Sequence, residues 1–91
     1  MRTDLIQQGT APRITAILNL VIATAADIFR LPSSQLGADA SPTNIKNWDS
    51  VEHLNLVLSL EQRFSIEFEP AEIEQMNSIG KIAELLERKL T

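Results

Sequence analysis

The chain has 91 residues, of which 44% are hydrophobic and 22% charged, with a formal net charge of −4 and no cysteine. This length suits one globular domain with a single core, and the composition argues against a disordered chain. The absence of cysteine excludes a disulfide framework, thiol catalysis and thiolate metal sites. The acidic balance makes nucleic acid an unsuitable partner, and no stretch has the roughly 20 apolar residues that span a membrane. We therefore expect a cytoplasmic monomer.

The first predicted helix follows residues 1–9, which carry no clear pattern and which we expect to form a flexible lead-in to a domain over residues 10–91. Thr10, with Pro12 in the first turn, opens this helix. Apolar residues then recur at three- and four-residue steps as far as about Arg30, and Pro32 ends the helix. This stripe predicts a face packed on a core, made of Ile14, Ile17, Leu18, Val21, Ile22, Ala25, Ile28 and Phe29.

A long loop is predicted over residues 31–48, which are rich in Pro, Ser, Gly, Ala and Asn. Its large apolar residues Leu36, Ile45 and Trp48 are expected to hold the loop against the core. Trp48 has two interpretations, an anchor that pins the loop or a partner contact beside Ser50. The anchor is favoured, because a large aromatic side chain contributes most when it is buried.

The second predicted helix runs from Ser50 to about Phe64. Asp49 is a favoured N-cap residue, and Glu52 three positions later completes the sequence signature of a capping box. Ser50 is then the first helical residue, where its hydroxyl is not needed for the cap and lies beside the positive end of the helix dipole. This is a favourable place to carry a phosphate. The alternative is that Ser50 is simply a second polar residue at a helix start.

The apolar residues of this second helix cover an arc of roughly 220° at the angular step of an α-helix, wider than one core-facing stripe. We expect one side of the helix to enter the core and the other, on the Ser50 side, to be partly exposed for docking. The alternative is that neighbouring helices bury both sides. The predicted core side is Leu56, Val57, Leu60 and Phe64, and the predicted docking side is Val51, Leu54 and Leu58.

Charge is unevenly distributed along the chain. Residues 1–49 have no net charge, whereas residues 50–74 carry −5. We therefore predict an acidic surface that begins at Ser50 and steers a partner with a basic patch toward this end of the molecule. The alternative is that these acids serve only solubility.

The last third of the chain predicts a connector and two more helices. Residues 64–68 alternate like a strand but have no partner strand, so we expect an extended connector. A short helix should run from Pro70 to about Met76, with Ile73 and Met76 facing inward. Asn77 or Ser78 should cap the last helix, whose buried stripe is Ile79, Ile82, Ala83, Leu86 and Leu90. The expected fold class is all-α, a small four-helix bundle of three main helices and one short one, with a long first loop.

Asp49, Ser50 and His53 also raise the possibility of a nucleophilic triad. A hydrolase serine needs a nearby base, an orienting acid and an oxyanion hole, but Asp49 is committed to the cap and no glycine-rich loop flanks Ser50. His53 falls beside Leu60 and Phe64 on the helical wheel, so we expect a partly buried, hydrogen-bonded imidazole. It has no carboxylates at a recognisable metal-ligand spacing. We therefore expect neither a catalytic residue nor a metal site.

The succession of these features resembles the acyl carrier protein family. Asp49-Ser50-Val51 opens an amphipathic helix, Ile66-Glu67-Phe68 and a short helix follow, and Asn77-Ser78-Ile79-Gly80 precedes the closing helix. The resemblance covers roughly residues 13–90. It implies that Ser50 receives 4′-phosphopantetheine from coenzyme A through a magnesium-dependent phosphopantetheinyl transferase. It also implies that the protein is a carrier, not an enzyme, and that the arm holds an acyl group as a thioester.

The resemblance further implies docking roles around Ser50. The partners would be acyl-transferring or acyl-activating enzymes with basic patches. Asp49 would take part in partner recognition, and Glu61 would contribute electrostatic contacts. Apolar docking contacts would come from Val51, Leu54 and Leu58. Asn55, Gln62 and Arg63 depart from the more acidic recognition helix of carriers in fatty acid synthesis, which indicates a specialised carrier in lipid, polyketide or related biosynthesis. Asn47 and Trp48 stand where peptidyl carriers usually have glycines, so an aminoacyl or peptidyl cargo is the less favoured alternative. An unmodified helical interaction module is another.

Overall fold

The structure, a computed structural model, describes residues 12–90. The predicted lead-in 1–9 and the predicted helix start at Thr10 lie outside this range. The described residues form four α-helices and one short 3₁₀ helix, without a strand, so the all-α prediction is confirmed. The elements are α2 (Pro12–Phe29), η1 (Ser33–Gln35), α3 (Ser50–Phe64), α4 (Pro70–Gln75) and α5 (Ile79–Leu90).

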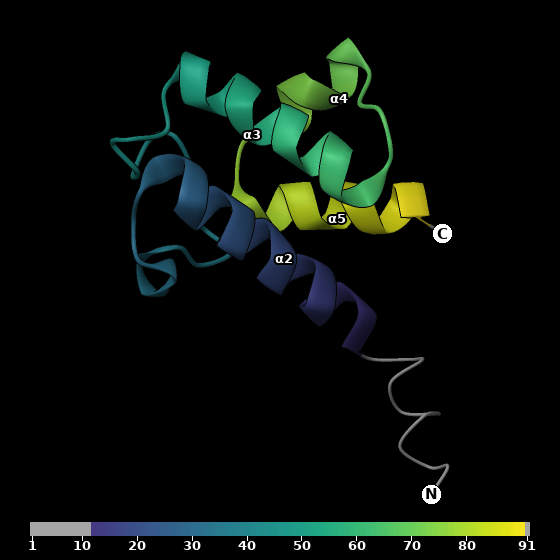
Figure 1. Ribbon diagram of the computed structural model, residues 1–91, viewed down its shortest axis with the longest axis horizontal. Coiled ribbons are helices and arrows are strands. Elements are labelled where there is room, and N and C mark those ends of the chain that lie inside the picture. The colour runs from purple at the N-terminus through teal and green to yellow at the C-terminus, as the bar shows by residue number, and fades with distance from the viewer. Residues whose placement is uncertain (1–11, 91) are drawn as a thin grey trace, which may run out of the picture.

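The three long helices enclose the core. Helix α2 packs against both α5 and α3, and the short α4 packs against α5. Helix α5 therefore lies between α2 and α4 (Figure 1). The predicted stripes of α2 and α5 supply eight of the eighteen buried hydrophobic side chains, because residues three and four apart share a helix face. Leu85 is an addition to the predicted stripe of α5, and Leu90 is only half-buried. The fully buried large side chains are Val21, Phe29, Leu56, Leu60, Met76, Ile79, Ile82 and Leu86.

The long loop between α2 and α3 lies packed on this core, as predicted. Leu36, Ile45 and Trp48 are all buried, and the Trp48 ring packs against Phe29 with a centroid separation of 5.1 Å. Trp48 is therefore an anchor with 2% of its surface exposed, and the partner-contact interpretation is wrong. The single turn η1 within the loop was not predicted.

The same loop also caps α5. The backbone N–H of Ile79 donates to the carbonyl of Ala40 at 3.0 Å, and that of Gly80 donates to Ala38 at 2.8 Å. A side chain at Gly80 would meet the Ala38 carbonyl oxygen at 3.1 Å, so glycine permits this close approach. Loop carbonyls thus satisfy N–H groups at the start of α5, which holds the loop in place over the bundle.

Helix boundaries agree with the capping signals. Helix α2 ends one residue before the predicted Arg30, which adopts a left-handed conformation (φ 59°) beyond the helix end. Helix α4 ends at Gln75, one residue short of the prediction, and a capping box of Glu69 and Glu72 opens it. Ser78, not Asn77, caps α5, because its hydroxyl oxygen accepts the N–H of Lys81 at 3.1 Å. Across residues 12–90, none of the helices has the length and apolar character needed to cross a membrane.

Candidate functional site

Ser50 occupies the first position of α3, as predicted. The cap residue Asp49 is extended, and its Oδ1 accepts the N–H of Glu52 at 2.9 Å. The first helical bond runs from the N–H of His53 to the Asp49 carbonyl at 2.8 Å. Ser50 itself is exposed, and no hydrogen bond with the described residues engages its hydroxyl. Asp49 therefore caps the helix, and the hydroxyl of Ser50 is accessible to an incoming reagent.

Glu52 departs from the predicted capping box. Its carboxylate accepts a hydrogen bond from the side-chain amide of Asn55 at 2.9 Å, one turn further along α3. The side chain of Asp49 thus accepts the predicted hydrogen bond from the backbone of Glu52. The reciprocal bond of a capping box, from the backbone N–H of Asp49 to the side chain of Glu52, is not formed. The exposed side of α3 gains a local side-chain pair instead.

The two sides of α3 are separated as the helical wheel predicted. Leu56, Val57 and Leu60 are buried, and Phe64 is half-buried. On the other side the exposed fractions are 66% for Val51, 56% for Leu54 and 57% for Leu58. Three large apolar side chains on one short helix face are unusually exposed for a small domain. The alternative in which neighbouring helices bury both sides is wrong, and docking by the exposed side stays a prediction.

Glu61 has a structural role that the sequence did not reveal. Its Oε2 accepts the backbone N–H of Phe68 at 2.9 Å, which ties the connector after α3 back to the helix. The same residue's carbonyl accepts the N–H of Ile66 at 3.1 Å. Phe68 lies beyond the end of α3 at Phe64, so the helical wheel could not have paired it with Glu61. Any electrostatic docking by Glu61 would use a carboxylate that already holds the fold.

The predicted acidic surface is divided between structural and exposed acids. Glu72 pairs with Lys89 of α5 at 3.0 Å. The N–H of Glu69 and the Lys89 ammonium lower the pKa of the Glu72 carboxyl, because both favour its charged form. Glu67, Glu69 and Glu74 are exposed. Glu74 also lines the groove beside Ser50, so it is an acid near the site that the sequence analysis did not single out.

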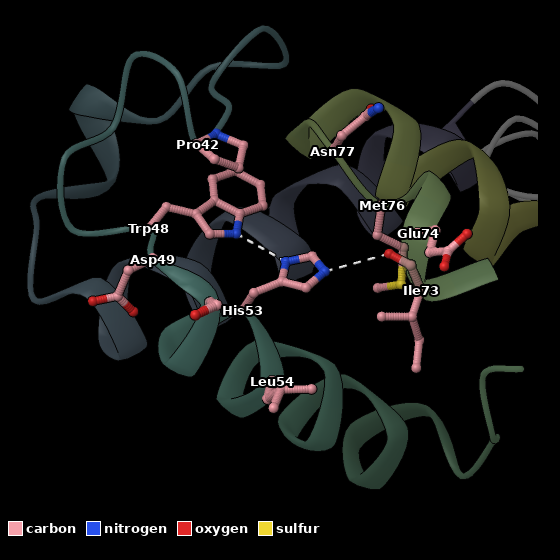
Figure 2. Close-up of a pocket in the computed structure, with 10 residues that line it drawn as sticks. Pro42, Trp48, Asp49, His53, Leu54, Ile73, Glu74, Met76 and Asn77 are labelled. Atoms are coloured by element: carbon pink, nitrogen blue, oxygen red, sulfur yellow. Dashed lines mark hydrogen bonds between the residues drawn. The ribbon is translucent and has the colours of Figure 1, made fainter. Parts of the chain in front are cut away.

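An apolar groove with a volume of about 540 Å³ opens beside Ser50. The loop, the first turns of α3 and the end of α4 supply its walls (Figure 2). Its floor includes Trp48 and Met76, which are almost completely buried. The volume lies in the range typical of small-molecule sites. The lining residues are Pro42, Trp48, Asp49, Ser50, His53, Leu54, Ile73, Glu74, Met76 and Asn77.

His53 bridges two walls of this groove. Its Nδ1 accepts the indole N–H of Trp48 at 2.9 Å, and its Nε2 lies 3.4 Å from the carbonyl oxygen of Ile73, as the dashed lines in Figure 2 show. The two rings are also stacked, with centroids 6.0 Å apart. The prediction of a half-buried, hydrogen-bonded histidine is confirmed. Because Trp48 and Ile73 engage both ring nitrogens, the triad with Ser50 is not formed.

Comparison with solved structures finds a protein of similar fold and sequence. No protein-family model matches the chain. The solution NMR structure of holo acyl carrier protein from Geobacter metallireducens is similar, with a TM-score of 0.74 and 30% sequence identity over 88% of this chain and 87% of that chain. The similarity therefore extends over nearly the whole of both proteins, in fold and in sequence. Together with the helical bundle described above, it shows that the chain belongs to the acyl carrier protein family.

Proposed function

We propose that this protein carries acyl groups as thioesters on a 4′-phosphopantetheine arm attached to Ser50 and shuttles them between enzymes of lipid, polyketide or related biosynthesis. The observation that carries the proposal is the free, exposed hydroxyl of Ser50 at the start of α3, beside a cap already made by Asp49. Attachment requires a hydroxyl that a large modifying enzyme can reach without disrupting the helix. Ser50 meets this requirement.

The surroundings of Ser50 suit a phosphodiester and its extension. The positive end of the α3 dipole favours a negative charge at its first residue. The apolar groove begins at the same residue and offers a surface for an attached chain. The arm would supply the thiol that this cysteine-free chain lacks, on which an acyl group is held. Ser50 would hold the arm covalently, and Leu54 and Ile73 would line its path.

The chain's own residues do not activate Ser50. The one histidine of the chain, His53, uses its ring nitrogens toward Trp48 and Ile73. Asp49 uses a carboxylate oxygen for the N–H of Glu52. A general base must lie within hydrogen-bond reach of the proton it removes. We infer that the base that deprotonates Ser50 comes from the phosphopantetheinyl transferase, and that this protein contributes position and accessibility.

We further propose that the exposed side of α3 docks the partner enzymes. Val51, Leu54 and Leu58 supply apolar contact next to the attachment point, and Asp49 and Glu61 supply negative charge toward a basic patch. Asn55, Gln62 and Arg63 are exposed on the same helix and reduce its acidic character. This charge pattern supports a specialised carrier, whose partners rely more on apolar contact than on charge.

Attachment is tested by incubating the protein with coenzyme A, Mg²⁺ and a promiscuous phosphopantetheinyl transferase, followed by intact mass spectrometry. We expect the wild type to gain the mass of one arm and Ser50→Ala to gain nothing. Ser34→Ala, which removes another exposed serine, is the matched control and should load like the wild type. Absence of the mass gain in the wild type would favour an unmodified interaction module, and a gain that persists in Ser50→Ala would place the arm elsewhere.

A further inference from the structure

The side chains of Trp48 and His53, with the carbonyl of Ile73, form a hydrogen-bonded strap across the groove beside Ser50. We propose that this strap limits how far an apolar cargo chain can enter the protein, so that Trp48 and His53 determine which cargo lengths are sheltered. The inference rests on the proposed function, because it concerns a chain tethered at Ser50. Short chains lie along the groove, and longer ones must displace the strap or remain outside.

The strap joins all three elements that form the groove. Trp48 comes from the end of the loop, His53 from the first turn of α3, and Ile73 from α4 (Figure 2). One imidazole therefore fixes the separation of the groove walls. Apart from the N-cap bonds of Asp49, neither the loop nor α4 has another bond to this point of α3 among the hydrogen bonds of residues 12–90.

The strap also has a defined donor and acceptor pattern. The indole N–H of Trp48 can only donate, so the Nδ1 of His53 must be unprotonated. The neutral ring then carries its hydrogen on Nε2, which faces the Ile73 carbonyl. Glutamine is the substitution that can reproduce the pattern, because its side chain offers one acceptor and one donor. Phenylalanine keeps a flat ring of similar bulk but offers neither.

The strap lies between the groove and the closed core. Trp48 lines the groove on one side and packs on Phe29 on the other. Phe29 belongs to the same buried cluster as Leu56 and Ile79, and each of the three has less than 2% of its surface exposed. Protein cores of this kind are close-packed and offer little free space to a chain. On the side of Phe29, a cargo chain longer than the groove therefore has to displace the Trp48 to His53 bond to enter the core.

The experiment uses full-length, isotope-labelled protein loaded at Ser50 from butanoyl- and dodecanoyl-coenzyme A. Intact mass confirms loading before any spectrum is recorded, so failure of the proposed function is seen separately. The chain has one tryptophan, and its indole N–H therefore gives a single NMR signal. For the wild type we expect nuclear Overhauser contacts from either acyl chain to Leu54 and Ile73, none to Phe29 or Ile79, and an Nε2-protonated ring at His53.

Three variants distinguish the effect of the strap's hydrogen bonds from the effect of the packing of the His53 side chain. In His53→Ala and His53→Phe, the dodecanoyl chain should gain contacts to Phe29 and Ile79, and the indole signal should shift and exchange faster with solvent. His53→Gln should behave like the wild type. Since His53→Phe preserves bulk, it decides the case if His53→Ala does not fold. The proposal would be overturned if the acyl chain of the loaded wild type contacted Phe29 or Ile79 while the indole signal stayed unmoved. It would also be overturned if these contacts were absent from both His53→Ala and His53→Phe.

Discussion

The assignment of Ser50 as a free attachment residue depends on Asp49 being the cap of α3, and this can be measured. Replacing Asp49 by alanine removes the acceptor for the N–H of Glu52. Loss of an N-cap side chain typically costs about 1 kcal/mol, within a range of about 0.5–2 kcal/mol. In a domain of this size, 1 kcal/mol lowers the unfolding temperature by about 4–8 °C. We expect Asp49→Ala to fall in that window.

Asparagine distinguishes the hydrogen bond from the charge. Asp49→Asn keeps an acceptor oxygen in the same position, and asparagine caps helices about as well as aspartate. Its stability should therefore fall by only a few tenths of a kcal/mol, mainly through the lost interaction of the carboxylate with the helix dipole. Asp27→Ala, which removes an exposed acid from the last turn of α2, away from any helix N-terminus, is the charge control and should stay within about 0.5 kcal/mol of the wild type.

Urea unfolding followed by circular dichroism gives the free energies of unfolding, and the loading rate of Ser50 is measured on the same samples. If Asp49→Asn loses as much stability as Asp49→Ala, the charge and not the hydrogen bond stabilises the helix start. If Asp49→Ala is as stable as the wild type, another group caps α3. Ser50 would then be the nearest hydroxyl for that task, and the argument that its oxygen is free would fail.

Four further outcomes test other parts of the molecule. Leu86→Ala, at a completely buried position of α5, should lower the free energy of unfolding by about 2–5 kcal/mol in urea titrations; a loss below 1 kcal/mol would contradict the core assignment. Leu58→Ser should change stability by less than about 0.5 kcal/mol yet weaken transferase binding, and unchanged kcat/KM for loading would remove this face from docking. Glu61→Gln keeps an acceptor for Phe68 and should slow association with a basic partner at low salt, whereas Glu61→Lys should also destabilise the fold; equal association rates for Gln and wild type would leave Glu61 a purely structural role. Because the pKa of Glu72 is held below its ordinary value of 4.5, its stabilising effect is full above that pH and is lost as pH falls through the lowered pKa; the stability gap between wild type and Glu72→Gln should shrink in acid, and a gap independent of pH would refute the ionic origin.

The helices and their ends could be predicted because their causes are local. The cap at Asp49, the proline at position 70 and the apolar steps of α2 and α5 each act within a few residues of the chain. The two-sided wheel of α3 also follows from local geometry, since a helix places residues at fixed angles. These signals do not depend on which elements finally meet. These local signals can therefore be recognised in the sequence alone.

The groove could not be predicted, because it is made by elements distant in sequence. The carbonyl of Ile73 meets His53 across 20 positions, and Pro42 and Met76 reach the groove from the loop and the end of α4. Glu61 illustrates the same limit at shorter range. Its charge and its place on α3 indicated docking, whereas its bond to Phe68 arises only once the connector folds back. A helical wheel cannot predict side-chain roles that depend on tertiary contacts.

The arrangement around Ser50 gives neighbouring residues separate roles. Asp49, Ser50 and Val51 are consecutive, yet the first caps the helix, the second is left exposed and the third opens the apolar face. His53, one turn further on, faces the groove and binds Trp48 and Ile73, which withholds from Ser50 the base that would make it a nucleophile. The imidazole thus has two consequences. It is unavailable to Ser50 as a base, and it joins α3 to the loop and to α4 beside the groove.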